Sequence, residues 1–376
     1  MLRVIHVAHQ PAPYGIGTLL IDLLRCQKSG YRDIEVAVAF HADGPTMATY
    51  RGIGVPVHCL ELSSGRDPRI FTRLRKLFRD CDIVNLHSHS PWALLAAKAA
   101  RKKVVFTFHG ALGLRKGRLG RLQKAYLRRL LVRYCDKVTF ASASSLSKYE
   151  NAVGCKGEHE GVEVFPYGLS VHEVVPTKDR EVVRRELGLL GCFVVGTAAR
   201  MCPIKRIDRL IDAFAMLPRE NAARLLIMGD GDSAYEAMLH DRVRDHVLNS
   251  RVLLLGYRAD AIDLIAALDV FVLPTGAPGE TFGLALLEAM SLGIPSIVFE
   301  DGGGAVEVLG DSGFVVKNPG ELCDLIIKLQ ADAPMRHSVG CRGRTRAELF
   351  DISHTADQFY RVYKSLVQCR PGMAGQ

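Results

Sequence analysis

The sequence predicts an α/β protein built from two parallel sheets, each with helices on both faces. Short apolar runs alternate with helical patterns along almost the whole chain, which is typical of parallel strands joined by crossover helices. The 376 residues are enough for two domains. Hydrophobic residues make up 48% and charged residues 24%, the composition of a globular protein with a large buried core.

Apolar runs in the first half of the chain predict six strands. They lie at residues 2–8, 34–40, 82–87, 103–108, 137–141 and 162–166. Ser90 followed by Pro91 predicts a helix start, with an N-cap and a proline at the first helical position. A loop at residues 9–18 follows the first strand, and its Gly17 stands where backbone can approach a ligand.

The second half repeats the alternation. Strands are predicted at residues 193–198, 224–228, 252–255, 269–274 and 294–299, and a last helix at 352–367. The run Gly-Asp-Gly-Asp that ends at Asp232 lies between a strand and a helix. We therefore expect Asp232 or Ser233 to cap the helix, and we assign no metal to this run.

Residues 279–290, with the sequence GETFGLALLEAM, hold two carboxylates eight residues apart. The preceding loop leads into a helix whose first turn is expected to carry Phe282, Gly283 and Leu284. A helix start with glycines offers backbone N–H groups to a phosphate. Glu288 lies among apolar residues and needs donors, which sugar hydroxyls would supply. The alternative is a structural pairing of Glu288 with a buried Arg or Lys.

Two cations follow the strand at residues 193–198. Arg200 and Lys205 precede a helix, and they suit a diphosphate because arginine binds it through two parallel hydrogen bonds and lysine as a point charge. Solvated surface charge is the alternative interpretation.

The pattern Glu-x7-Glu within GETFGLALLEAMSLGIP closely resembles the signature of retaining glycosyltransferase family 4. The resemblance implies the GT-B fold, in which two Rossmann-like doubly wound domains face a central cleft. It places an N-terminal acceptor domain at residues 1–170, a linker and lead-in at 171–190, and a nucleotide-sugar donor domain at 191–350. Residues 351–376 would form a terminal helix that returns to the N-terminal domain, plus a tail.

The same resemblance implies roles for single residues. Arg200 and Lys205 match the diphosphate pair, Glu280 would hold donor-sugar hydroxyls, and Glu288 would hold the ribose. His109 resembles the donor-site histidine near the transferred sugar, whereas His87 and His89 are interpreted as ordinary polar residues. The other expected donor-binding residues are Gly17, Tyr257, Arg258, Phe282, Gly283 and Leu284. The chain departs from the family at Tyr14 and Arg206, where glycine is usual or common.

The resemblance implies an enzyme that moves a sugar, with retention, from a nucleoside-diphosphate sugar to an acceptor hydroxyl. Cell-surface polysaccharide or glycolipid synthesis would be its setting. The nucleotide sugar is the substrate, and neither a metal nor a further cofactor is expected. Three alternatives stay open: a nucleotide-sugar epimerase on the same fold, an NAD-dependent oxidoreductase and a basic nucleic-acid-binding protein. The oxidoreductase is weakened by the lack of a full G-x-G-x-x-G, and no nucleic-acid partner is expected because the basic block has few aromatic residues.

The net charge of +9 favours anionic partners. Residues 114–134 combine an apolar helical stripe with basic residues, so this segment would either lie on an anionic membrane or present a solvated face. The sequence has no run of about 18 apolar residues and no signal-peptide pattern. Its ten scattered cysteines suit reduced thiols. We expect a cytoplasmic protein, with peripheral attachment to the inner face of the plasma membrane as a hypothesis, and a sugar or lipid-linked acceptor.

Overall fold

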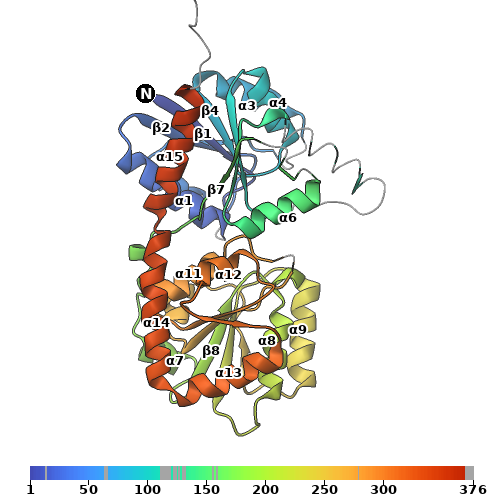
Figure 1. Ribbon diagram of the computed structural model, residues 1–376, viewed down its shortest axis with the longest axis vertical. Helices are drawn as coiled ribbons and strands as arrows, with labels where there is room; N and C mark the ends of the chain where they lie inside the picture. Colours follow the sequence, from blue (N-terminus) through green and yellow to red (C-terminus); the bar gives the residue numbers. More distant parts are fainter. Residues whose placement is uncertain are drawn as a thin grey trace, which may run out of the picture. The chain divides into compact units, whose positions relative to one another are not determined.

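The computed structural model describes residues 1–12, 15–62, 67–110, 120–121, 125, 128, 133–154, 156–157, 160–277 and 279–368. The chain forms two compact units (Figure 1). Unit 1 comprises Met1–Leu169 together with Ile352–Gln376, and unit 2 comprises Ser170–Asp351. Each unit contains one sheet, and all strand pairs in both sheets are parallel.

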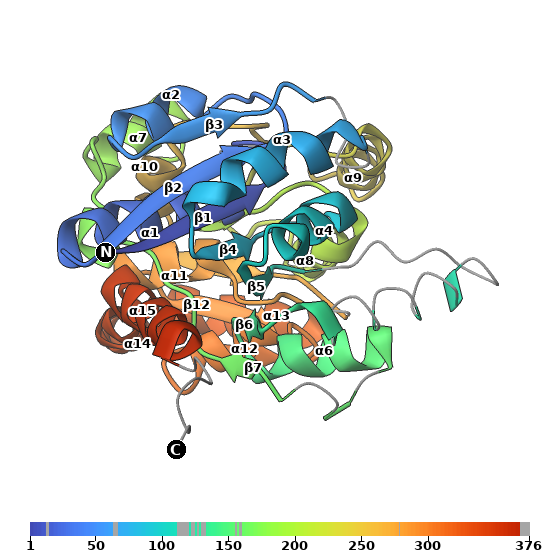
Figure 2. The ribbon, with the colours of Figure 1, turned by 90° about the horizontal axis from the view of Figure 1, so that it is seen from above.

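The sheet of unit 1 has seven strands in the order β3-β2-β1-β4-β5-β6-β7. The strands are β1 Leu2–Ala8, β2 Ile34–Phe40, β3 Val57–Cys59, β4 Ile83–Leu86, β5 Lys103–Phe108, β6 Lys137–Phe140 and β7 Val162–Val164. The helices are α1 Ile16–Gly30, α2 Met47–Gly52, α3 Arg69–Leu77, α4 Pro91–Ala99, α6 Ala143–Val153 and α15 Ile352–Gln368. Figure 2 shows α1 and α15 on one face of this sheet and α3, α4 and α6 on the other.

The two faces of the unit 1 sheet differ in chemistry. Ile5, Val7, Val84 and Leu86 pack with apolar residues of α3, α4 and α6 in one buried cluster. Because successive side chains of a strand alternate between faces, the residues between them point toward α1 and α15. His6 lies between Ile5 and Val7 and is completely buried, and the same face of β4, β5 and β6 carries the buried polar residues Asn85, Thr107 and Thr139.

The sheet of unit 2 has six strands in the order β10-β9-β8-β11-β12-β13. The strands are β8 Phe193–Ala198, β9 Ala223–Met228, β10 Val252–Leu254, β11 Val270–Leu273, β12 Ser296–Phe299 and β13 Phe314–Val316. Its helices are α7 Arg180–Glu186, α8 Ile207–Met216, α9 Ser233–Asp245, α10 Ala261–Ala266, α11 Leu284–Ser291, α12 Gly304–Leu309, α13 Pro319–Ala331 and α14 Ala333–Ala347. Apolar residues of α8, α9 and α13 form the core on one face of this sheet.

Every strand expected from the sequence is present, and two short strands were missed. β3 and β13 each have three residues and lie at the edges of their sheets, too short to show a periodic pattern. Both predicted caps are confirmed: Ser90 accepts a hydrogen bond from the Ala93 N–H, and Asp232 accepts from Ala234 and Tyr235.

Some sequence-based expectations lie outside the described residues. These are most of the basic segment at 114–134, the departure at Tyr14 and the tail after Cys369. Among the residues that are described, no helix combines the length and the apolar character needed to cross a bilayer.

Candidate active site

Lys205 and Glu280 meet in unit 2, although they are 75 residues apart in the sequence. β8 and β11 are neighbours in the sheet, and each of these residues follows the carboxyl end of one of them. The Lys205 Nζ donates to Glu280 Oε2, and the two side chains are only 19% and 17% exposed. The buried Thr275 hydroxyl donates to the same Glu280 oxygen at 3.3 Å. A cation and a carboxylate are thus fixed at one point at the carboxyl edge of the sheet.

The backbone of Glu280 is hydrogen-bonded to the glycine loop at residues 302–304, which follows β12. Its N–H donates to the Gly302 carbonyl at 2.9 Å, and its own carbonyl accepts from the Gly304 N–H at 2.8 Å. Gly279 has a φ of 75°, and a Cβ there would lie 3.1 Å from the Gly303 Cα. Glycine is therefore needed at position 279, both for its backbone conformation and for the close approach of the two loops.

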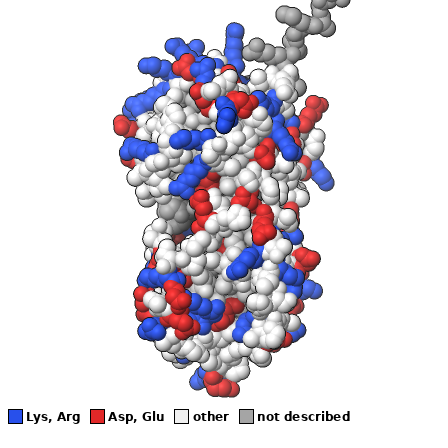
Figure 3. Space-filling model, turned by 90° about the vertical axis from the view of Figure 1, so that its left-hand side faces the viewer, with Lys and Arg blue, Asp and Glu red and all other residues white. Residues whose placement is uncertain are grey.

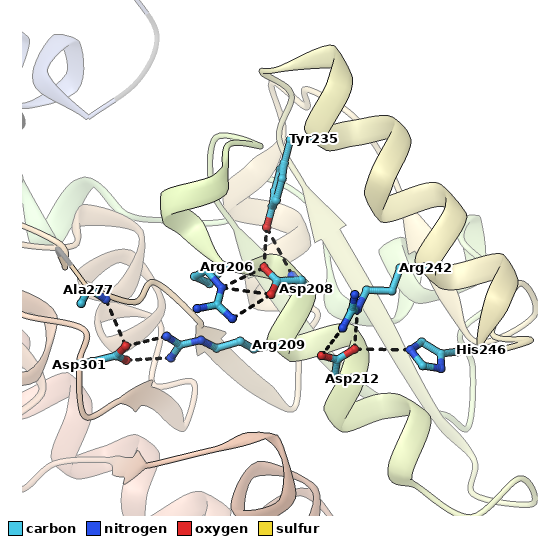
Figure 4. A network of polar contacts seen from close by, with 9 residues as sticks. All are labelled: Arg206, Asp208, Arg209, Asp212, Tyr235, Arg242, His246, Ala277 and Asp301. Atoms are coloured by element: carbon cyan, nitrogen blue, oxygen red, sulfur yellow. Dashed lines mark hydrogen bonds and ion pairs between the residues drawn. The ribbon is translucent and has the colours of Figure 1, made fainter. Parts of the chain in front are cut away.

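A second ion pair connects α8 to the glycine loop after β12 (Figure 4). Arg209 of α8 donates to both carboxylate oxygens of Asp301, at 2.8 and 2.6 Å, and its guanidinium lies 4.7 Å from the centre of the Phe299 ring. Asp301 also accepts from the Ala277 N–H at 3.1 Å. The hydrogen bond from Arg209 lowers the pKa of Asp301, and the same bond raises the pKa of Arg209. Sequence reasoning missed this pair; a charged residue within the apolar stripe of α8 was the available signal.

The helix after Glu280 starts later than expected. α11 begins at Leu284, and Gly283 has a φ of 102°, so Phe282 precedes the helix rather than forming its first turn. The Phe282 ring is buried and packs edge-on against Phe350, with ring centres 5.6 Å apart. Its side chain is therefore used in packing, and a ligand would meet its backbone. Glu288 lies one turn beyond Leu284 and is partly buried.

The loop after β8 presents Arg200 as an exposed residue, with its stem beside Gly231. Arg206 has a φ of 49°, in the left-handed region that glycine adopts most readily. Arg206 thus adopts a conformation that would cost a glycine less, and its guanidinium donates a hydrogen bond to Asp208 at 3.1 Å.

Tyr257 and Arg258 follow β10, as expected from the sequence. Tyr257 is 47% exposed, whereas Arg258 donates to both oxygens of Asp260 at 2.7 and 2.6 Å. This hydrogen bonding raises the pKa of Arg258. Since the Arg258 guanidinium is bound to Asp260, recognition by this residue would fall to its backbone.

Gly17 and His109, the remaining expected site residues, belong to unit 1. Gly17 lies in the first turn of α1, where a Cβ would stand 1.8 Å from the Ala12 carbonyl oxygen. His109 follows β5, and its Nε2 lies 2.9 Å from Nδ1 of His87. Burial lowers the pKa of His109 to about 3. His87 was interpreted as an ordinary polar residue, yet it is buried and also contacts His6, a residue that sequence reasoning did not select.

Comparisons with known proteins identify the family of this chain. A family profile described as "Glycosyltransferase Family 4" matches residues 13–172, and one described as "Glycosyl transferases group 1" matches residues 192–332. A GDP-mannose-dependent monoacylated alpha-(1-6)-phosphatidylinositol monomannoside mannosyltransferase from Corynebacterium glutamicum is 30% identical over 290 residues, which cover 72% of each chain. An N-acetyl-alpha-D-glucosaminyl L-malate synthase from Bacillus anthracis is 28% identical, over 76% of this chain and 75% of the relative.

The fold is also that of solved structures. HepE from Anabaena, crystallised in complex with UDP and glucose, superposes with a TM-score of 0.85 and 24% identity. The match covers 97% of this chain and 100% of the HepE chain. The two parallel Rossmann-like sheets, the two family profiles and the mannosyltransferase relative lead to one conclusion: this chain belongs to glycosyltransferase family 4 and is a glycosyltransferase with the GT-B fold.

Proposed function

We propose that this enzyme transfers a hexose, with retention of anomeric configuration, from a nucleoside-diphosphate sugar to an acceptor hydroxyl. The contact between Lys205 and Glu280 carries the proposal. In a nucleotide sugar, the diphosphate is bonded directly to the sugar. A cation for the phosphate and an acceptor for sugar hydroxyls must therefore be neighbours, as these two side chains are.

The catalytic work in this proposal is electrostatic. Negative charge develops on the leaving diphosphate as the glycosidic bond breaks. Lys205, Arg200 and the backbone at residues 282–284 would stabilise that charge, and fixed charges of this kind often supply the largest catalytic contribution. Because the two cations come from the protein, the reaction is expected to proceed without a metal.

The remaining assignments follow the family resemblance. Glu280 would accept hydrogen bonds from the donor sugar, and Glu288 from the ribose. Backbone at Tyr257 and Arg258 would meet the nucleobase, and His109 would meet the transferred sugar. Thr275 and the loop at residues 302–304 hold Glu280 in place, so we add them as supporting groups.

We further propose a lipid-linked acceptor, reached at an anionic membrane surface. The mannosyltransferase relative is named for an acylated phosphatidylinositol mannoside, whereas the name of the malate synthase contains no lipid. On the described residues of the face drawn in Figure 3, Lys and Arg side chains alternate with Asp and Glu side chains, so that face does not indicate a membrane contact. The support for membrane binding is instead the basic segment at 114–134.

Co-sedimentation with liposomes tests the acceptor proposal. Binding should require anionic lipid, weaken with added salt, and drop when Arg121, Lys124 and Arg128 are replaced by glutamine. A matched control replaces Arg219, Arg224 and Arg244 of unit 2 by glutamine, which removes the same charge elsewhere. Wild-type protein that stays in the supernatant with anionic liposomes at low salt would make a soluble acceptor the better proposal.

The donor proposal is tested by thermal stabilisation. UDP-, GDP-, ADP- and dTDP-sugars are screened for a rise in the unfolding temperature. A donor present at 100 times its Kd adds about 2.7 kcal/mol to the free energy of unfolding. EDTA is included so that stabilisation is measured without a divalent metal. NMR of the product then gives its anomeric configuration. Lys205→Ala should abolish the stabilisation, whereas Lys178→Ala, which removes another lysine of unit 2 paired to a glutamate, should retain it. Equal stabilisation of both variants, or an inverted product, would refute the proposal.

A further inference from the structure

A continuous chain of hydrogen bonds links four side chains of unit 1. Gln27 Oε1 lies 3.0 Å from His6 Nε2, His6 Nδ1 lies 2.8 Å from His87 Nε2, and His87 Nδ1 lies 2.9 Å from His109 Nε2. Consecutive rings are stacked, with centres 5.1 and 5.2 Å apart. The first three residues are at most 4% exposed, and His109 is half-buried. The chain therefore leads from the interior to a partly exposed histidine.

The path of this chain follows the topology of the sheet. β1, β4 and β5 are adjacent, and they supply or directly precede His6, His87 and His109 in that order. His6 lies within its strand, whereas the other two histidines lie just past the carboxyl ends of theirs. All three side chains are on the face covered by α1, which supplies Gln27.

Neutral imidazoles make such a chain directional. Burial lowers the pKa of His6 to about 4 and that of His109 to about 3, and it lowers the pKa of His87 as well, so each ring carries one proton at pH 7. A neutral imidazole has one N–H donor and one acceptor nitrogen. Gln27 Oε1 can only accept, so His6 donates from Nε2 and accepts at Nδ1. His87 must then donate from Nε2, and His109 must donate from its own Nε2.

We infer that Gln27, His6 and His87 are positioning residues that hold the proton of His109 on Nε2 and make its Nδ1 a hydrogen-bond acceptor for a hydroxyl group. The inference rests on the proposed function, which assigns His109 to the transferred sugar. It adds the ring atom that meets the sugar and the residues that set its protonation. If the Gln27 amide were reversed, every bond in the chain would reverse, and His109 would present an N–H donor instead.

A second buried polar row on the same face supplies a matched control. The Thr139 hydroxyl donates to Thr107 at 3.1 Å, and the Thr107 hydroxyl donates to Asn85 at 2.7 Å. Asn85 in turn donates to the Tyr363 hydroxyl of α15 at 2.8 Å. Thr139 is completely buried. Thr139→Val therefore removes a buried hydrogen bond of this face at a residue that is not a member of the histidine chain. The Thr139 hydroxyl also lies 3.5 Å from that of Tyr167, whose ring packs against His109, so the variant tests a structural change beside the chain that leaves its four members in place.

The tautomers are measured by NMR on the full-length protein with its 13 histidines labelled with ¹⁵N. Long-range ¹⁵N–¹H correlation spectra distinguish protonated from unprotonated ring nitrogens, and His109→Gln assigns the signal of His109. Wild type and Thr139→Val should show His109 protonated on Nε2. His87→Leu and Gln27→Leu should show a mixture of both tautomers, and His87→Gln, whose amide can both donate and accept, should restore the wild-type form.

Kinetics then separate positioning from a purely structural role. His87→Leu should lower kcat for sugar transfer about tenfold, whereas His87→Gln and Thr139→Val should keep kcat within about twofold of wild type. In all three variants, the thermal stabilisation by the free nucleotide diphosphate should equal that of wild type. If His87→Leu does not fold, the same measurement is made on Gln27→Leu, for which the same tenfold loss of kcat is expected. Three results would overturn the inference: a wild-type His109 protonated on Nδ1, an unchanged tautomer in both leucine variants, or unchanged kcat in them. If the wild type transfers no sugar, the proposed function fails, while the spectra still decide the tautomer.

Discussion

Substitutions at Gly276 and at Arg209 should have non-additive effects on stability, because both disrupt the Arg209–Asp301 ion pair. A Cβ at position 276 would lie 2.1 Å from Arg209 Nη2, so Gly276→Ala must displace the guanidinium from Asp301. Arg209→Met removes the same guanidinium but keeps an apolar stem over Phe299. Both substitutions therefore break the same interaction, and combining them should add little to either one.

The magnitude follows from burial. The Arg209 and Asp301 side chains are 11% and 37% exposed, so the pair lies between an exposed one, worth about 0–1 kcal/mol, and a buried one, whose breakage costs about 3–5 kcal/mol. We expect each single variant to lose about 2 kcal/mol of unfolding free energy. The double variant should also lose about 2 kcal/mol, which gives a coupling energy of about 2 kcal/mol.

Chemical denaturation followed by two probes measures this effect. The single tryptophan, Trp92, lies in α4 of unit 1, whereas far-UV circular dichroism reports on both units. If the units unfold separately, the shift should appear in the dichroism transition of unit 2 and leave the Trp92 fluorescence transition unchanged. Gly343→Ala in α14, where a Cβ would make only ordinary contacts with Met290 at 3.8–3.9 Å, is the control within unit 2. Additive losses, or a Gly276→Ala variant as stable as wild type, would refute the reasoning.

Three further predictions concern the site and the buried histidines. Arg200→Ala and Lys205→Ala should each lower kcat/KM at least about tenfold, or roughly 1.4 kcal/mol, and simple additivity of the two effects would count against a shared diphosphate. Glu288→Gln should weaken use of the donor in steady-state kinetics because charge-assisted bonds are lost, and wild-type kinetics in a folded variant would refute its role. The free energy of unfolding should fall as pH is lowered from 6.5 toward 4, because the pKa of His6 and of His41 is lowered from 6.5 to about 4 in the folded protein and the unfolded chain takes up protons first. The slope is about 1.4 kcal/mol per pH unit for each such histidine, and a flat urea-denaturation profile between pH 6.5 and 5 would contradict it.

The fold was predictable because apolar strands alternate with helical patterns, and the strands near the middle of each sheet are mostly buried. β1, β2, β5 and β8 have the bounds expected from the sequence. Helix ends were harder, because they depend on the backbone conformation of single residues. Gly283 illustrates this: its φ of 102° ends the preceding loop and delays α11 until Leu284, which no periodicity indicates.

The meeting of Lys205 and Glu280 could be anticipated in part, because ligand-binding residues gather at the carboxyl ends of parallel strands. The Arg209–Asp301 pair could not. Its members are 92 residues apart, and their contact depends on a glycine at 276 that leaves room for the guanidinium. Sequence patterns identify strands and motifs, whereas a pairing of this kind exists only once the loops are placed in three dimensions.

The histidine chain shows that sequence patterns also leave the protonation state of a site residue undetermined. His109 could be selected from its place at a strand end, but its tautomer is not a property of that residue. It depends on the acceptor at Gln27, transmitted through two rings that sequence reasoning treated as unremarkable or did not consider. Because each neutral ring must donate at one nitrogen and accept at the other, replacing the distant glutamine is expected to change what His109 offers to a hydroxyl. A functional residue in this sheet is therefore defined by the hydrogen-bonded row to which it belongs, and the row becomes visible only when the strand order places positions 6, 87 and 109 side by side.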